Sequence, residues 1–212
     1  MEKKTKRIIM AFIGVFFTGV SIAIFRTADF GTDPFTCLIL GIWNVSGFSY
    51  SIVFTVVTGL LLVGVFIVKR HYIGIATVLN LLFIGVIAEK SMVIFGKLFP
   101  SPQMYTRVIL LVAALILLCF STSLYFTADL GVSAYDAWAL ILADRKVVPF
   151  RACRIGTDVV CVVAGAIMGV WPGVGTLITA FGMGPLIEFF NKRFSIPLLA
   201  GELFTKKDAI IK

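Results

Sequence analysis

Long apolar segments separated by short polar ones dominate this chain. Six of the segments have about the length of a membrane-spanning helix, and they cover residues 8–25, 50–68, 73–95, 108–126, 155–170 and 174–190. A helix needs about 20 mostly apolar residues to cross the hydrocarbon core of a bilayer. Charged residues gather at the ends of these segments. The pattern therefore predicts six transmembrane helices.

Two further apolar segments, 35–43 and 132–143, are too short to cross a membrane. A helix of about 12 residues rises roughly 18 Å, whereas the hydrocarbon core is about 30 Å thick. Asp33 and Pro34 suit the start of the first short helix, because aspartate caps helix N-termini and proline fits the first turn. We therefore predict two short re-entrant helices that enter the membrane without crossing it.

The chain also contains an internal repeat. The pentapeptide TADFG at 27–31 recurs as TADLG at 127–131, and each copy follows a long apolar segment and precedes a short one. The residues between 21 and 40 that recur unchanged 100 positions later are Ser21, Thr27, Ala28, Asp29, Gly31 and Leu40. A second set recurs 99 positions later, namely Gly74, Thr77, Gly85 and Glu89. We infer a duplication, with membrane repeats at 1–99 and 100–194 and a cytoplasmic tail at 195–212.

Three full spans in each repeat place the two repeats in opposite orientations. The two TAD-x-G turns then enter from opposite faces and point toward the middle of the bilayer. Short helices at matched positions of an inverted repeat are the best sequence indication of a transport site. The predicted fold class is therefore an all-α polytopic membrane protein with six transmembrane helices and two re-entrant helices, arranged as an inverted 3+3 repeat.

An eight-span model, in which both short segments cross the membrane in a parallel 4+4 arrangement, is the alternative. Charge does not separate the two models, because both leave most Lys and Arg residues on the side of the N-terminus. Length favours six spans. The short segments also carry Asp33 or Asp136, and a charge near the centre of a span costs about 2.5–3.5 kcal/mol.

Composition agrees with a membrane protein. Hydrophobic residues make up 59% of the 212 residues and charged residues 14%, whereas soluble domains average about 45–50% and about 25%. The basic residues behind the net charge of +8 stand at the ends of apolar segments, where they set topology and contact lipid headgroups. We expect the lipid bilayer as a partner, no nucleic acid partner, and N- and C-termini in the cytoplasm.

No motif indicates an enzyme, a metal site or a cofactor. The four cysteines lie in or beside apolar segments without a CxxC spacing, and the only histidine, His71, follows Lys69 and Arg70. The chain has no nucleophile elbow, no P-loop and no paired-histidine motif. We therefore expect free thiols, no metal, no cofactor and a function other than catalysis.

The TAD-x-G turns hold the first candidate site residues. Asp29 and Asp129 either cap the N-termini of the short helices or bind a cation, a proton or a cationic substrate. The other candidates in these turns offer hydrogen bonds or a left-handed backbone, and they are Thr27, Thr127, Gly31 and Gly131.

Further candidates are polar residues inside the apolar segments. Asp136 and Asn80 have no obvious partner in the sequence and are candidates for binding an ion or a substrate. The secondary candidates, each with a basic residue close in sequence that offers an ion pair, are Glu89, Glu188 and Asp158. Lys90 follows the first of them, Lys192 lies one helical turn after the second, and Arg154 stands four residues before the third.

The twin turns resemble a known family. The segments TADFGTDPF at 27–35 and TADLGVSAYDAW at 127–138, with the six spans and the basic N-terminus, are similar to the YczE/YyaS/YitT family of bacterial integral membrane proteins. The resemblance covers nearly the whole chain and implies a protein of the bacterial plasma membrane. It implies no catalytic residues and no settled activity, although one member is associated with the production of antibiotic secondary metabolites.

The leading functional hypothesis is a small secondary transporter or permease for an unknown small molecule or ion, with its site between the two TAD-x-G turns. One alternative is a non-transporting membrane partner or scaffold that uses the basic loop 144–154 as its contact surface and supports, for example, secondary-metabolite production. Another is the substrate-capturing subunit of a multi-subunit importer. The sequence leaves the oligomeric state open.

Overall fold

The computed structural model describes residues 3–144 and 150–200, and the fold is given for these residues alone. Their helices are α1 (Lys3–Ala28), α2 (Pro34–Ser46), α3 (Tyr50–Lys69), α4 (Ile75–Leu98), α5 (Met104–Ala128), α6 (Ala134–Asp144), α7 (Phe150–Ile167), α8 (Val174–Phe190) and α9 (Ile196–Ala200). A 3-10 turn follows α3, and a π-helical turn joins α8 to α9. No strand occurs in these two ranges, which confirms the predicted all-helical class.

Five helical segments are long and apolar enough to cross a membrane. They are Lys4–Ala28, Tyr50–Tyr72, Ile75–Leu98, Met104–Ala128 and Val174–Ala200. Each overlaps one of the six segments that the apolar pattern predicts, and the sixth predicted segment corresponds to α7, an 18-residue helix. The described residues therefore fit a polytopic membrane protein.

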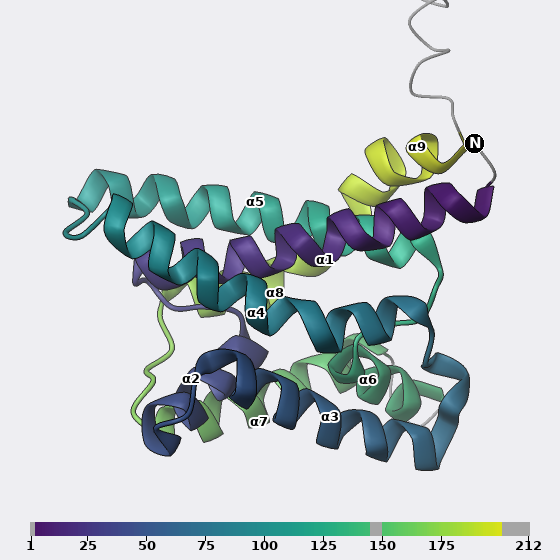
Figure 1. The fold of residues 1–212 in the computed structure, drawn as a ribbon, viewed down its shortest axis with the longest axis horizontal. Coiled ribbons are helices and arrows are strands. Elements are labelled where there is room, and N and C mark those ends of the chain that lie inside the picture. The colour runs from purple at the N-terminus through teal and green to yellow at the C-terminus, as the bar shows by residue number, and fades with distance from the viewer. Residues whose placement is uncertain (1–2, 145–149, 201–212) are drawn as a thin grey trace, which may run out of the picture.

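Helices α1 and α5 lie side by side and run antiparallel (Figure 1). Arg7, near the start of α1, lies 3.5 Å from Asp129 at the end of α5. Arg107, near the start of α5, lies 2.9 Å from Asp29 at the end of α1. Between these ends the hydroxyls of Thr18 and Ser121 are 3.0 Å apart. Helix α4 packs along α1 as well, and α8 packs on α5.

The short segments form short helices, as predicted. Helix α2 has 13 residues, and the preceding residue, Asp33, caps it by accepting a hydrogen bond from the backbone N–H of Thr36 at 3.1 Å. Pro34 occupies the first turn and Gly47 ends the helix in the left-handed conformation. Helix α6 has 11 residues, and the Ser133 hydroxyl before it accepts from the N–H of Asp136 at 3.0 Å.

The N-terminal ends of the two short helices meet inside the molecule. Phe35 of α2 and Tyr135 of α6 stack with their ring centroids 4.9 Å apart. From this contact the helices run in different directions, α2 packing against α7 and α6 against α3 (Figure 1). The indole N–H of Trp138 donates to the carbonyl of Leu61 at 3.1 Å and thereby fixes α6 on α3.

The expectation that Asp29 and Asp129 cap the short helices is wrong. Both residues have a positive φ, 53° and 52°, and they follow the last turns of α1 and α5. Their side chains are mostly exposed, at 72% and 82%, and face Arg107 and Arg7. Several residues separate each turn from the short helix that follows it, so the caps fall on Asp33 and Ser133 instead.

Gly31 and Gly131 make the left-handed, closely packed turns that were expected, with φ of +93° and +104°. A Cβ atom on Gly31 would lie 2.5 Å from the Thr176 hydroxyl, and one on Gly131 would lie 2.6 Å from the Thr77 hydroxyl. The carbonyl of Phe30 accepts from the N–H of Gly175 at 2.8 Å. Each turn therefore packs on the first turn of α8 or α4, where no side chain fits.

Candidate functional site

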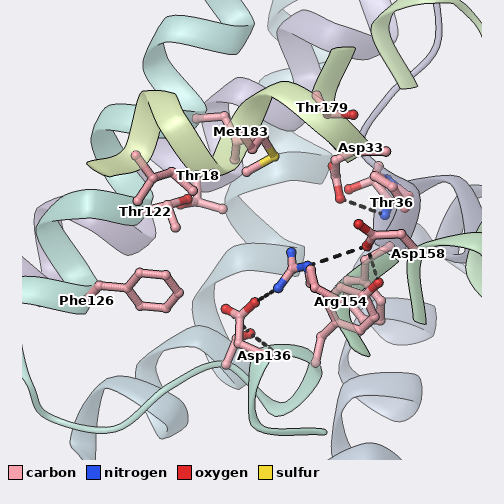
Figure 2. Close-up of a pocket in the computed structure, with 18 of the residues that line it drawn as sticks. Thr18, Asp33, Thr36, Thr122, Phe126, Asp136, Arg154, Asp158, Thr179 and Met183 are labelled. Carbon is pink, nitrogen blue, oxygen red and sulfur yellow. Dashed lines mark hydrogen bonds and ion pairs between the residues drawn. The ribbon is translucent and has the colours of Figure 1, made fainter. Parts of the chain in front are cut away.

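A cavity of about 540 Å³ lies where the starts of α2 and α6 meet (Figure 2). Residues from both short helices and from α1, α3, α4, α5, α7 and α8 line it. Its size is in the usual range for small-molecule sites, about 300–1,000 Å³. Non-helical backbone at membrane depth is tolerated only where it is buried in protein or lines such a cavity. The cavity is therefore the natural candidate for a functional site.

One guanidinium group connects two carboxylates in the wall of this cavity. Arg154 of α7 forms an ion pair with Asp136 of α6. Its Nε atom also lies 3.5 Å from a carboxylate oxygen of Asp158, one turn further along α7. Both aspartates are buried, with 6% and 4% of their surface exposed. Figure 2 shows the three side chains converging from two helices.

Hydroxyl groups complete the coordination of these carboxylates. Tyr125 of α5 donates to the Asp136 carboxylate, and the Ser133 hydroxyl donates to the same carboxylate at 2.7 Å. Tyr135 donates to Asp158 at 2.5 Å, and its ring lies under the Arg154 guanidinium at 4.7 Å. Buried charges are stable only when paired and hydrogen-bonded in this manner.

Asp33 is the third carboxylate of the cavity, and it differs from the other two. One of its oxygens caps α2, as described above, but Asp33 has no ion pair within residues 3–144 and 150–200. The partial positive charge of a helix N-terminus, about half a unit, partly offsets its negative charge. Among the described residues the cavity is lined by three aspartates, one guanidinium and Glu188, and Glu188 is paired with Lys192 at 2.6 Å.

Neutral polar and aromatic side chains form the rest of the wall. Thr58 and Asn80 are buried, with 3% and 6% exposed, and the Thr58 hydroxyl has no hydrogen-bond partner among the described residues. The aromatic lining comes from both halves of the chain and comprises Phe35, Phe54, Tyr125, Phe126, Tyr135 and Phe181. A site of this kind offers an apolar surface with a few fixed polar groups.

The structure brings only some of the predicted site residues to this cavity. Those that line it are Asn80, Asp136, Asp158 and Glu188. Those outside it are Thr27, Asp29, Gly31, Glu89, Thr127, Asp129 and Gly131. The carboxylates of Asp29 and Asp129 lie at opposite ends of the α1–α5 pair, and ligand binding by them stays a prediction.

The expected ion pairs have mixed outcomes. The Arg154–Asp158 pair is confirmed at 3.5 Å, and Lys192 pairs with Glu188 at 2.6 Å. The expected pair of Glu89 with Lys90 is absent from the ion pairs of the described residues, because Glu89 instead accepts from the N–H of Ser51 at 2.9 Å. Asp136 has no obvious partner in the sequence, and in the structure it pairs with Arg154 from a different helix.

The basic loop proposed as a contact surface is also corrected in part. Arg154 belongs to α7 and lines the cavity, so it is not part of an external surface. Arg145 and Lys146 lie outside the described residues, as does the side chain of Arg151.

Sequence reasoning missed several cavity residues, above all Asp33, Tyr125, Tyr135 and Thr58. Asp33 was interpreted only as a helix cap. A signal was nevertheless present, because a carboxylate next to a predicted half-helix start lies at membrane depth, where charged groups are rare and usually functional. The tyrosines carried no such signal, since aromatic residues are common throughout the apolar segments.

Comparison with known proteins supplies a family. A family model described as "Family of unknown function (DUF6198)" matches residues 5–192. An uncharacterized protein of Haemophilus influenzae is 25% identical over 118 residues, which are 56% of this chain and 53% of that protein. The uncharacterized membrane protein YczE of Bacillus subtilis is 26% identical over 145 residues, 68% of this chain and 63% of its own. The aligned part therefore spans between about half and two thirds of these relatives.

The similarity to YczE confirms the family resemblance drawn from the TAD-x-G turns. It also supports a location in a membrane. No solved structure matches the chain.

Proposed function

The chain belongs to the DUF6198 family of unknown function, and we propose that it is a small secondary transporter whose substrate site is the cavity between α2 and α6. In this proposal the protein lies in the bacterial plasma membrane with both termini in the cytoplasm. The proposal rests on an inverted arrangement of two halves and on a difference in packing between them.

Matched contacts support the inverted arrangement. Arg7 of the first half pairs with Asp129 of the second half, and Arg107 of the second half pairs with Asp29 of the first half. The two arginines stand 100 positions apart in the sequence, as do the two aspartates, so the two ion pairs are equivalent. The turn contacts exchange in the same manner, since Phe30 accepts from Gly175 at 2.8 Å and Leu130 accepts from Ala76 at 2.9 Å. A two-fold axis in the membrane plane relates such contacts in many secondary transporters.

The short helices support six spans with two re-entrant segments. Both start at the cavity, where Phe35 and Tyr135 stack. Helix α2 then ends beside the start of α3, with Trp43 packed on Tyr50 at 5.8 Å between ring centroids. Helix α6 ends beside the other end of α3, where Asp144 lies 2.5 Å from Lys69. Two half-helices with N-termini at a central cavity are a common construction of transport sites.

The observation that carries the proposal is a packing difference between matched helix pairs. A Cβ atom on Gly85 of α4 would lie 3.1 Å from both Ser51 and Phe54 of α3, so these helices are in close contact. The matched residue of α8, Gly184, has no neighbouring atom within 4 Å among the described residues. Gly184 lines the cavity together with Glu188 and Asn191. We infer that the cavity is open between α7 and α8 and closed between α3 and α4.

Such a difference is what alternating access requires. In an inverted repeat, each half can adopt the conformation that the other half has now. When the two halves exchange conformations, the opening of the cavity moves to the opposite side of the membrane. The half formed by α7 and α8 would then close as α3 and α4 separate. A scaffold without transport activity has no need for this exchange.

The test is labelling of a cavity residue from each side of the membrane. In a background without native cysteines, Met183→Cys in sealed vesicles of both orientations is exposed to a thiol reagent that does not cross membranes. Met183 lines the cavity, so a transporter should show labelling from both sides. Labelling from one side only would contradict the proposal and favour the scaffold.

Two control positions define the sides. Phe48→Cys, at an exposed site between α2 and α3, should label only from outside, and His71→Cys, at the opposite end of α3, only from the cytoplasm. Labelling of position 71 from outside would instead support eight spans.

A further inference from the structure

We propose that the cavity binds a small organic cation, with an ammonium group against Asp33 and an apolar body among the aromatic side chains. This inference rests on the proposed function only in naming what is transported. The binding site itself can be tested without transport.

The charges of the cavity favour a cation. Arg154 offsets one of the three aspartates, and it is already engaged by Asp136 and Asp158. The N-termini of α2 and α6 together add about one further unit of partial positive charge. Glu188, the fourth carboxylate of the lining, is offset by Lys192 at 2.6 Å. About one negative charge is left, and it lies nearest to Asp33, which accepts a hydrogen bond from the backbone N–H of Thr36 at its own helix start.

A second, independent observation points to a ligand at the same place. Asn80 lines the cavity, only 6% of its surface is exposed, and its amide makes no hydrogen bond to the described residues. A buried polar group without a partner is rare in a folded protein and calls for an explanation. The amide oxygen of Asn80 can accept a hydrogen bond from an ammonium ion.

An anionic substrate fits this cavity poorly. The groups that bind anions in transporter sites are helix N-termini and arginine side chains. Here the start of α2 is occupied by the Asp33 carboxylate and the start of α6 by the Ser133 hydroxyl. The guanidinium of Arg154 is bound by two carboxylates. An added anion would have to displace these partners and would meet two buried negative charges.

The walls determine what kind of cation fits. Phe35, Phe54 and Phe181 line the cavity with apolar surface, and aromatic faces attract organic cations. Within the described ranges no group of three or more His, Cys, Asp or Glu side chains is arranged to hold a metal ion. A volume of about 540 Å³ accommodates an ammonium group with a ring-sized apolar body.

The experiment uses three probes of similar shape and different charge. The purified full-length protein in detergent is titrated with phenethylammonium, with neutral 2-phenylethanol and with anionic 3-phenylpropionate, and binding is followed by calorimetry. We expect phenethylammonium to bind at least about tenfold more tightly than the other two, because only it forms charged hydrogen bonds to Asp33.

Two variants assign the binding to the proposed residues. Asp33→Asn should weaken phenethylammonium binding about tenfold or more while preserving the fold, because asparagine is an equally good helix cap. Its matched control is Asp29→Asn, a carboxylate four residues away that lies outside the cavity, and this variant should bind as the wild type does. Asn80→Leu should weaken binding several-fold without lowering the unfolding temperature of the unliganded protein, because the removed amide makes no hydrogen bond to the described residues.

The proposal is overturned if phenethylammonium does not bind, if the neutral or anionic probe binds as tightly, or if Asp33→Asn binds it unchanged. These outcomes are separate from the labelling of Met183→Cys. Selective cation binding with one-sided labelling would leave the cation site standing and remove transport, whereas two-sided labelling without cation selectivity would do the reverse.

Discussion

The guanidinium of Arg154 is shared by carboxylates on two helices, Asp136 of α6 and Asp158 of α7. All three side chains face the cavity, and both aspartates are buried. In such a place the loss of one partner leaves the others as uncompensated charges, and the cost is far larger than the net contribution of the intact pair. Arg154 is therefore the residue on which the charge balance of the site depends.

Replacement of this residue gives a prediction about stability. Arg154→Met should lower the free energy of unfolding by about 3–5 kcal/mol, because it leaves two buried carboxylates without their cation. Arg154→Lys should lose less, since it retains the charge but not the two-sided geometry of the guanidinium. The measurement is denaturant unfolding of the purified protein in detergent. The control is Lys192→Met, which removes an exposed ion pair with Glu188 and should cause no measurable loss.

How far single residues could be predicted depends on where their partners lie. The Arg154–Asp158 pair follows from four-residue spacing on one helix, and the structure confirms it. The Arg154–Asp136 pair joins different helices, and no local spacing indicates it. Of the two alternatives for Asp29, the helix cap is wrong for a related reason. A repeated aspartate beside a short helix suggests a cap. However, residues 30–33 connect Asp29 to the first residue of α2, so Asp29 is too far along the chain from that helix to cap it.

At the scale of elements, the closest backbone approach occurs where each TAD-x-G turn packs on another helix. Gly31 sits on Gly173 and Thr176 at the start of α8, and Gly131 sits on Gly74 and Thr77 at the start of α4. These contacts explain why glycines and threonines recur at both offsets. Each turn needs a glycine at the helix start opposite it, and the hydroxyl of Thr77 or Thr176 accepts a hydrogen bond from the N–H of that glycine. The packed turns fix the segments that connect α1 to α2 and α5 to α6.

Alanine at Gly31 separates close packing from backbone strain. Gly31→Ala introduces a Cβ atom 2.5 Å from the Thr176 hydroxyl at a residue whose φ is +93°. Gly47→Ala is the matched control, with a φ of +70° and no neighbouring atom within 4 Å. The control should lose about 1 kcal/mol of unfolding free energy through strain alone, and Gly31→Ala about 1–3 kcal/mol more through overpacking. Equal losses in denaturant unfolding would show that the turn does not pack as described.

The elements themselves were largely predictable. The apolar pattern located the long helices and the start of α2, because hydrophobic length and capping residues are local signals. It underestimated helix ends, so that the segment at 108–126 became α5 at Met104–Ala128. Charged and polar residues end the membrane-embedded part of a helix but do not break its hydrogen bonds. The contact between the two short helices at Phe35 and Tyr135 joins residues that are far apart in the sequence, so no local pattern predicts it. Only the internal repeat suggested that the two helices meet.

At the scale of the whole molecule, the two halves use similar helices in different packing. Thr55 of α3 donates to the carbonyl of Leu81 on α4 at 3.5 Å. The residues at the matched positions, Ile155 of α7 and Ala180 of α8, both line the open cavity. If the halves exchange conformations, the second pair should approach as closely as the first pair does now. The proposed transport cycle therefore predicts a contact between Ile155 and Ala180 in the exchanged conformation.

Paired cysteines test this statement in the membrane. The reagent is a thiol crosslinker that joins only cysteines in direct contact. The double variant Thr55→Cys/Leu81→Cys should be crosslinked readily, because α3 and α4 are packed together in the described state. Ile155→Cys/Ala180→Cys should also react, more slowly, as the exchanged state is visited and trapped. Trapping should close the α7–α8 opening and prevent labelling of Met183→Cys from the cytoplasmic side. A protein in which only the first pair reacts does not exchange its halves, and its cavity would then serve as a one-sided binding site.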